Sequence, residues 1–321
     1  MFCPRLSGGF IQTVLIRVTV SNNQNHHSAI KHRRTHAFSL LELIVTVAII
    51  AILIAIITPA LTKARRNARG VLTMNNQRQI VVLLNNFASD NNGRYPESVA
   101  TIGLLDGHWN WQEPTMLTAC RSRSPQLHRS MSAYLHGYVE DANVMFCPNA
   151  PTRYKYLSRL WSAGDNWDNP ETPATDDPAF GTYCFYWNYT GFLGEEKGVF
   201  NGPQSASGNP RHSKLLVSDY FGFEHWRSPD AFGSCENFPS AAVTHGTAVS
   251  SDYWSCLRTD PNAGPGTIDI KLHAGYTDGH VDTYTASQTV PMWVSITPDG
   301  TAAYPDGLGP GVFYLPETAL P

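Results

Sequence analysis

The stretch HAFSLLELIVTVAIIAILIAIITPALTKARR, residues 36–66, holds one acidic side chain, Glu42, near the start of a long apolar run. No other residue from Phe38 to Leu61 is charged. As a helix, residues 38–61 extend about 36 Å, which exceeds the bilayer hydrocarbon thickness of about 30 Å. An acid inside a membrane costs about 2.5–3.5 kcal/mol on insertion scales and is functional by default. The pattern predicts a membrane-spanning helix in which Glu42 has a partner, and a plain single-pass anchor is the alternative.

The residues around the start of this run form a processing pattern. A basic, polar segment, AIKHRRTHA, ends at the small residue Ala37, which is followed by Phe38, with Glu42 at the fifth position of the apolar helix. This pattern resembles the processing site of type IV prepilins and type II secretion pseudopilins. The resemblance implies cleavage between Ala37 and Phe38 by prepilin peptidase and methylation of the new amine on Phe38. Most members of the family have Gly before the cut, so Ala37 is a departure.

The same resemblance implies an assembly role for Glu42. After cleavage the α-amino group of Phe38 is a cation in the apolar layer, where opposite charges attract strongly and a lone charge is costly. The two groups can meet within one helix or between neighbouring subunits, and in this family the second arrangement is held to set the axial register. Pro59 predicts a kink or loosening near residues 55–59, as in pilin-like helices, although membrane helices also tolerate proline without special purpose.

The helix is predicted to continue beyond the membrane. An apolar stripe at helical spacing would pack it against a globular head; the stripe consists of Ile80, Leu83, Leu84 and Phe87. The segment SDNNGRYP, residues 89–96, contains Asn, Gly and Pro and predicts the end of the helix. Tyr-Pro after an Asn-Gly turn also resembles the major pseudopilins of type II secretion.

From residue 98 onward, short β-type runs alternate with loops rich in Gly, Pro and Asn, and residues 181–194 and 212–223 are predicted strands. The segment NVMFCPNAP predicts a strand end at Cys147 and resembles a Cys-Pro found in large pseudopilin-like proteins. Within residues 268–284, positions 268–277 alternate between apolar and polar with a period of two, and Asp278-Gly279 then predicts a two-residue type I′ hairpin turn. The predicted fold class is α+β: a long N-terminal transmembrane helix packed on an antiparallel β-sheet head, pilin-like.

A two-residue turn places several polar side chains of this hairpin together. His273 would face Tyr284, and His273, His280 and Asp282 would share one polar face. His273, Asp278, His280 and Asp282 are the metal candidates, and calcium is the ion that Asp278 and Asp282 would suit. Calcium takes six to eight oxygen ligands, however, and histidine does not suit it. A hydrated polar face is the competing interpretation, and no cofactor is predicted.

Other candidate chemistry is sparse. Glu195 and Glu196 are adjacent carboxylates in a turn, where neighbouring side chains point apart. The sequence has no G-x-S-x-G, H-E-x-x-H or P-loop motif, so no enzyme is predicted. The aromatic runs HWNWQ and YCFYWNY either bind sugar or pack in a core or interface. Two alternatives stay open: a membrane-anchored surface module that binds carbohydrate or another cell-surface ligand, and an anchored hydrolase.

Composition narrows the partners. The 321-residue chain has a formal net charge of −3 and 15% charged residues, which gives no electrostatic case for binding nucleic acid. Its six cysteines include no C-x-x-C pair, so a zinc-ribbon or thioredoxin-type motif is not indicated. Cleavage after Ala37 would leave five cysteines, an odd number, and at most two internal disulfide bridges.

The predicted organisation has three parts: a leader at residues 1–37, a pilin-like helix at 38–92 that is transmembrane over 38–61, and a β-rich head at 93–321. Basic residues flank the apolar run on both sides, so the positive-inside rule does not decide its orientation. The resemblance implies a single-pass protein of the inner membrane with its head in the periplasm or in an extracellular filament. The implied partners are prepilin peptidase, other pilin or pseudopilin subunits, the inner-membrane assembly machinery and the lipid bilayer.

Overall fold

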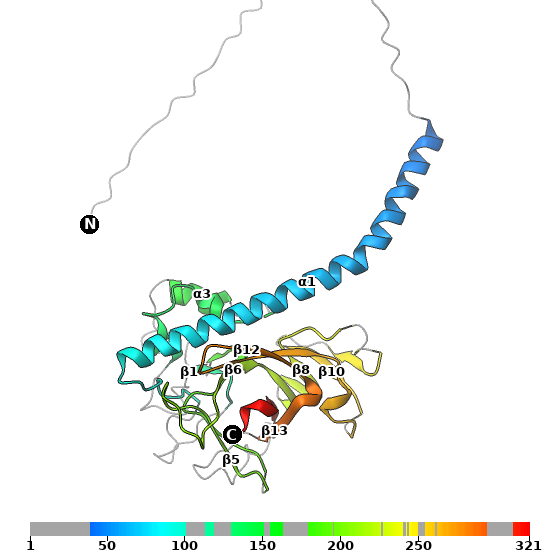
Figure 1. Ribbon diagram of the computed structural model, residues 1–321. Coiled ribbons are helices and arrows are strands. Elements are labelled where there is room, and N and C mark those ends of the chain that lie inside the picture. Colours follow the sequence, from blue (N-terminus) through cyan, green and yellow to red (C-terminus); the bar gives the residue numbers. More distant parts are fainter. Residues whose placement is uncertain are drawn as a thin grey trace, which may run out of the picture. The chain divides into compact units, whose positions relative to one another are not determined.

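The computed structural model describes residues 39–100, 113–118, 130–150, 155–162, 179–194, 196–225, 227–239, 242, 244–249, 254–260, 262–293 and 311–321. The chain divides into two compact units, Met1–Ile56 and Ile57–Pro321. The long helix α1 (Leu40–Asp90) begins in the first unit and ends in the second. The long helix and the antiparallel sheets form an α+β architecture that matches a pilin-like fold (Figure 1). This confirms the predicted fold class.

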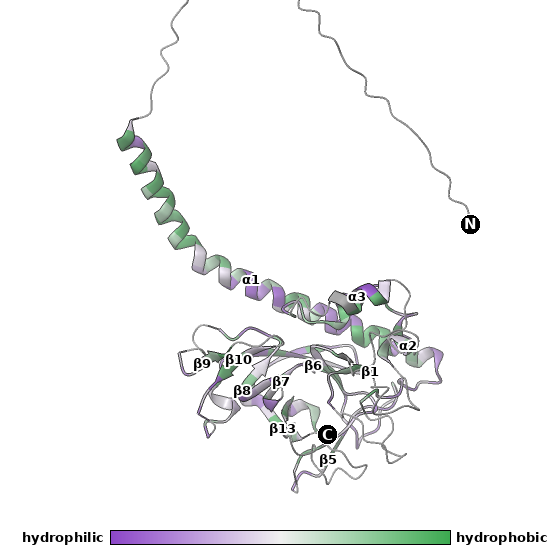
Figure 2. Ribbon diagram, turned by 180° about the vertical axis from the view of Figure 1, so that it is seen from behind, coloured by the Kyte–Doolittle hydropathy of each residue, from purple (hydrophilic) through white to green (hydrophobic). Residues whose placement is uncertain are grey.

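The first half of α1 is apolar and exposed. Every side chain from residue 40 to residue 64 is exposed, and Figure 2 shows this part of the helix as strongly hydrophobic before the more polar segment that follows. Within the described residues, α1 is the helix that is long and apolar enough to cross a membrane. The helix continues unbroken through Pro59, where the Thr62 hydroxyl donates to the carbonyl oxygen of Thr58 at 3.0 Å. The predicted loosening near residues 55–59 therefore does not interrupt the helix.

The second half of α1 packs on the head through the predicted stripe. Ile80, Leu83 and Leu84 are buried in the main hydrophobic core, and the partly buried Phe87 packs against it. The helix and the sheet approach closely at Gly275, where a Cβ atom would lie 2.9 Å from Val81 Cγ2. The absence of a side chain at this position lets α1 lie against the four-stranded sheet (Figure 1).

The end of α1 follows from the turn residues that come after it. Asn92 (φ 56°) and Gly93 (φ 77°) both adopt the left-handed conformation, which Asn and Gly tolerate best. The Gly93 N–H donates to the carbonyl oxygen of Ala88 at 2.7 Å, a contact of the Schellman type. The helix thus ends within two residues of its predicted end, at the predicted signal.

The described residues of the head form three antiparallel sheets. The eight-stranded sheet has the order β5-β4-β13-β14-β7-β8-β10-β9, the four-stranded sheet β12-β11-β6-β3, and the smallest sheet pairs β1 with β2. The strands are β1 (Met116–Thr118), β2 (Ala179–Phe180), β3 (Tyr183–Phe185), β4 (Thr190–Phe192), β5 (Val199–Asn201), β6 (Leu215–Asp219), β7 (Phe221–His225), β8 (Ser228–Ser234), β9 (Thr247–Val249), β10 (Ser255–Arg258), β11 (Lys271–Tyr276), β12 (Val281–Thr285), β13 (Thr289–Trp293) and β14 (Val312–Pro316). The remaining described helices are α2 (Met131–Leu135), α3 (Lys155–Ser162) and the 3-10 turns η2 (Ala142–Met145), η5 (Pro265–Thr267), η6 (Ala286–Gln288) and η7 (Glu317–Ala319).

Each of the two long predicted strands is in fact two strands in different sheets. Residues 181–194 contain β3 and β4, and residues 212–223 contain β6 and most of β7. β3 and β6 belong to the four-stranded sheet, whereas β4 and β7 belong to the eight-stranded sheet. The chain leaves one sheet for the other at Asn188, which has a positive φ of 51°, and at the buried Tyr220. These breaks lie inside apolar runs, so β propensity alone did not locate them.

The hairpin β11–β12 has a different register from the predicted one. Leu272 pairs with Tyr284 and His273 with Thr283, one position away from the two-residue turn expected at Asp278-Gly279. The loop has three residues, and Gly279 (φ 94°) takes the left-handed position while its N–H donates to the carbonyl oxygen of Tyr276. Three-residue hairpin loops commonly place glycine at such a position. Because side chains alternate between faces, the one-residue shift moves His273 away from the face of Asp282.

Candidate functional site

The start of α1 forms a reciprocal cap that involves Glu42. The Ser39 N–H donates to Glu42 Oε2 at 2.9 Å, and the Glu42 N–H donates to Ser39 Oγ at 3.2 Å. This is the S-x-x-E capping box, which satisfies two backbone donors that a helix start leaves free. The signal is readable in the sequence as SLLE, but the sequence interpretation considered Glu42 only as a charge in lipid. Glu42 therefore has Ser39 as a local partner, whereas the predicted partner was the amine of Phe38.

The predicted cleavage site, Ala37 and Phe38, lies outside the described residues. Phe38 directly precedes Ser39, so an amine at Phe38 would be one residue from the N–H that Glu42 already binds. The carboxylate uses Oε2 for this contact, and within the described residues no contact of Oε1 is found. The pairing of Glu42 with the Phe38 amine stays a prediction.

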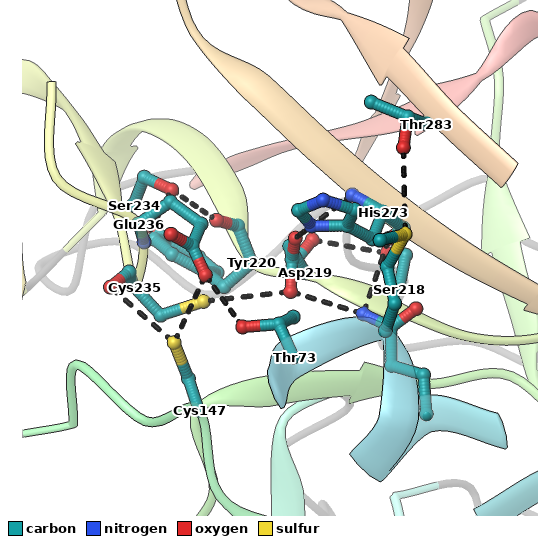
Figure 3. A network of polar contacts seen from close by, with 12 residues as sticks. Thr73, Cys147, Ser218, Asp219, Tyr220, Ser234, Cys235, Glu236, His273 and Thr283 are labelled. Atoms are coloured by element: carbon teal, nitrogen blue, oxygen red, sulfur yellow. Dashed lines mark hydrogen bonds and ion pairs between the residues drawn. The ribbon is translucent and has the colours of Figure 1, made fainter. Parts of the chain in front are cut away.

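A second candidate site is a group of polar side chains beneath α1, which we call the buried polar cluster (Figure 3). Its members come from segments far apart in the sequence and are all buried. Thr73 and Gln77 lie on α1, Cys147 follows η2, Asp219 ends β6, Cys235 and Glu236 follow β8, and His273 lies on β11. Cys147 was predicted to end a strand, which is wrong: it follows a 3-10 turn.

Asp219 is the most highly connected member of the buried polar cluster. Its Oδ2 accepts from the His273 backbone N–H and contacts His273 Nδ1, both at 2.8 Å. Its Oδ1 accepts from Gln77 Nε2 at 3.0 Å, and the same Gln77 nitrogen donates to the His273 carbonyl oxygen at 3.2 Å. A residue of α1 thereby contacts both the Asp219 carboxylate and the His273 backbone in the four-stranded sheet.

Glu236 forms the other half of the cluster. Its Oε1 accepts from the Thr73 hydroxyl at 2.8 Å and from Cys147 Sγ at 3.3 Å. Its Oε2 accepts from Asn149 Nδ2 at 3.0 Å. One ligand-type atom each from Asp219, Glu236 and His273 lies within 4.8 Å of the other two, and the same holds for Cys147, Cys235 and Glu236.

Burial and like charge shift the pKa values in this cluster. Burial raises the pKa of the Glu236 carboxyl, and the neighbouring charge of Asp219 raises it further. Burial alone lowers the pKa of His273, but the hydrogen bond to Asp219 and the charges of Asp219 and Glu236 outweigh it, so the pKa lies above its ordinary value. Burial raises the pKa of the Cys147 thiol to about 11.

A cavity of about 230 Å³ adjoins the buried polar cluster. Glu236 and His273 line it from the cluster side, Gly70 and Met74 line it from α1, and Lys271 lines it from β11. The cavity therefore connects two members of the cluster with residues at the protein surface, since Lys271 is exposed.

Three of the metal candidates predicted at the hairpin lie together at the turn, namely Asp278, His280 and Asp282. His273 is not among them. His280 Nδ1 is hydrogen-bonded to Asp278 Oδ1, and His280 Nε2 lies 3.6 Å from Asp282 Oδ2. The three side chains are 47–60% exposed, and the His280 ring stacks on Tyr276. Partial burial raises the pKa of Asp278, but its hydrogen bonds with His280 outweigh this and lower the pKa overall. The three side chains form an exposed polar group at the turn, whereas His273 belongs to the buried polar cluster.

The aromatic run YCFYWNY is part of the core rather than a sugar-binding surface. Its aromatic side chains are all buried and belong to the main hydrophobic cluster; they are Tyr183, Phe185, Tyr186, Trp187 and Tyr189. The second aromatic run, HWNWQ at residues 108–112, lies outside the described residues, as does Glu195, while Glu196 is exposed.

A third polar group holds a buried ion pair. Glu113 Oε2 lies 3.3 Å from Arg227 Nη2, and Glu113 Oε1 lies 2.9 Å from His225 Nε2. The Arg227 guanidinium lies 4.7 Å from the ring centroids of both Phe180 and Trp254.

Burial lowers the pKa of His225, although Glu113 opposes the shift. Arg227 also donates to the Gly181 carbonyl oxygen at 3.2 Å. The fully buried Arg227 ties β8 to the segments around β1 and β2, which is a structural role.

Comparison with known proteins places the N-terminal segment in a defined class. Residues 32–58 match the family model described as the prokaryotic N-terminal methylation motif. This motif is the prepilin-type cleavage and methylation signature, so the chain carries the segment of a prepilin-peptidase substrate, which implies assembly with other pilin subunits. The apolar half of α1 lies within and just beyond the match and is consistent with membrane anchoring. No curated protein and no solved structure matches the chain.

Proposed function

We propose that the protein is a structural subunit of a type II secretion pseudopilus or a type IV pilus-like filament. In this proposal prepilin peptidase removes residues 1–37, the Phe38 amine is methylated, and residues 38–61 anchor the subunit in the inner membrane. The head then lies in the periplasm or in an extracellular filament. The observation that supports the proposal most is the carboxylate of Glu42, set within an apolar helix and within the methylation motif.

The capping box adds a physical reason for the position of Glu42. One carboxylate oxygen, Oε2, holds the first turn of the helix through Ser39. The other oxygen, Oε1, is then oriented and is available to a cation at the same depth in the bilayer. The methylated Phe38 amine of a neighbouring subunit is such a cation, and an ion pair in a low-dielectric layer is strong when both partners are present.

The head is proposed to act in assembly rather than in catalysis. The aromatic side chains of residues 183–189 fill the core, and this removes one of the two aromatic runs that supported a carbohydrate-binding head. The buried stripe on α1 fixes the head to the helix that enters the filament. The proposed partners are the peptidase, other subunits, the inner-membrane assembly machinery and the bilayer.

Filament fractionation tests the proposal. The chain would be expressed with a prepilin peptidase and a pilus or secretion assembly system, and sheared filaments would be probed for the head. We expect the chain in the sheared fraction only when the peptidase is active. Its retention in the membrane fraction in both strains, at equal level, would contradict a filament role.

A further inference from the structure

The buried polar cluster holds two carboxylates, and the one basic side chain of the described residues in contact with them is His273, while Arg66 and Lys271 line the adjoining cavity. Asp219 is fully buried, Glu236 is 5% exposed, and their ligand-type oxygens lie within 4.8 Å of each other. Arg227, the buried arginine of the described core, is paired with Glu113 instead. Two buried carboxylates at this separation are costly unless a cation or a proton lies between them.

We propose that Asp219, Glu236 and His273 bind a divalent transition-metal ion of the zinc class. The two carboxylates and the ion sum to zero charge when the imidazole is neutral, so the ion supplies the missing positive charge. The inference is independent of the filament role, because all three proposed ligands lie in the head.

The geometry suits such an ion. Zinc binds imidazole nitrogen and carboxylate oxygen at about 2.0–2.2 Å, which places neighbouring ligand atoms about 3–3.5 Å apart. The His273 Nδ1 to Asp219 Oδ2 separation is 2.8 Å, and the third ligand atom, on Glu236, lies within 4.8 Å of both residues. The ion would take the place of the proton between His273 and Asp219, with a small outward movement of the two atoms.

The residues around the three ligands hold them in place. Gln77 donates to Asp219 Oδ1 at 3.0 Å, and Thr73 donates to Glu236 Oε1 at 2.8 Å. Hydrogen bonds of this kind orient metal ligands and contribute to affinity. Both donors come from α1, so the ion would join the helix to the sheet through its ligands.

The nature of the ligands and the adjoining cavity define the kind of site. An imidazole with two carboxylates suits zinc and neighbouring transition metals better than calcium, which takes six to eight oxygens. The cavity of about 230 Å³ is lined by both Glu236 and His273. It gives the ion a route to the cluster and leaves room for water at the positions that the three side chains do not fill.

Metal analysis of the full-length chain in detergent tests the proposal. The protein would be stripped with a chelator, equilibrated with Zn²⁺ or Co²⁺ alone, desalted and analysed for bound metal. We expect one equivalent in the wild type and loss of that equivalent in Asp219→Asn, Glu236→Gln and His273→Gln. Thr73→Val should weaken binding by about 10–100-fold, because it removes only a hydrogen bond to a ligand.

The hairpin turn offers matched controls. Asp278→Asn and His280→Gln change the same residue types on exposed side chains, and both variants should bind metal like the wild type. Loss of binding in these controls, with retention in the cluster variants, would place the ion at the turn and overturn the proposal.

Two measurements on the wild type keep the test decisive even where a cluster variant does not fold. X-ray absorption of the zinc-loaded chain should show nitrogen and oxygen ligands without sulfur, and the cobalt form should lack a thiolate charge-transfer band. Sulfur ligation would assign the ion to Cys147 and Cys235 and overturn this ligand set. A wild-type chain that binds neither metal would overturn the site altogether.

Discussion

Substitution of Glu42 separates the two roles that the structure and the motif give to this residue. Glu42→Gln keeps an oxygen that can accept from the Ser39 N–H, since the capping box accepts Glu or Gln, and it deletes the charge. Glu42→Ala deletes both the cap and the charge. Ser39→Ala removes the serine half of the cap and keeps the charge. These three variants form a matched set on one turn of helix.

The expected magnitudes differ enough to be resolved. Removing one partner of a buried ion pair costs about 3–5 kcal/mol, which at about 1.4 kcal/mol per tenfold weakens a subunit contact by at least about 100-fold. Loss of an N-terminal cap costs about 1 kcal/mol, about fivefold, and α1 is also held by its packing on the head. Membrane insertion should be unchanged or improved by removal of the charge, because the acid costs about 2.5–3.5 kcal/mol in lipid.

The assay scores membrane level and filament yield for each variant in a strain that assembles filaments. Glu42→Gln and Glu42→Ala should insert normally and fail to assemble, whereas Ser39→Ala should assemble. If Glu42→Gln assembles like the wild type while Glu42→Ala and Ser39→Ala are equally impaired, Glu42 serves only as a helix cap and the reasoning is refuted.

Three further predictions concern the head. Arg227→Met leaves Glu113 buried without its guanidinium partner and should destabilise the protein by about 3–5 kcal/mol; an unchanged thermal midpoint in detergent would show that the pair contributes little. Gly275→Ala should lower the free energy of unfolding by about 1–3 kcal/mol, because the new Cβ would lie 2.9 Å from Val81 Cγ2. Gly137→Ala is the control and should be nearly neutral, because no atom lies within 4 Å of its Cβ position. Equal thermal midpoints for the two variants would contradict the close contact. Maleimide labelling mapped to individual cysteines should reach four buried thiols only after unfolding: Cys147, Cys184, Cys235 and Cys256. Rapid labelling of any of these four in the folded chain would disprove its burial.

Features encoded by local periodicity were predictable from the sequence. The apolar run, the stripe at Ile80, Leu83 and Leu84, and the Asn-Gly stop signal each depend on residues within one or two helical turns of each other. The predicted helix therefore agrees closely with α1 (Leu40–Asp90). The S-x-x-E cap at Ser39 was equally local and readable, and it was missed because Glu42 was considered only for its charge.

Features decided by tertiary pairing were not predictable in the same way. Whether Asp278-Gly279 forms a two-residue or a three-residue loop depends on the left-handed conformation of Gly279, and that choice decides the face on which His273 lies. The buried polar cluster joins residues up to 200 positions apart, from Thr73 to His273, and no short motif links them. A sequence signal did exist in the strand LLVSD, since Ser218 and Asp219 follow three apolar residues, and a buried acid in a strand needs a partner.

The mass of the mature N-terminus tests the central claim most directly. The chain would be purified from cells with an active prepilin peptidase, and its N-terminal peptide would be measured by mass spectrometry. The account predicts a chain that begins at N-methylated Phe38, and loss of this species when Ala37 is replaced by a bulky residue. An intact leader, or a cut elsewhere in the apolar run, would contradict it.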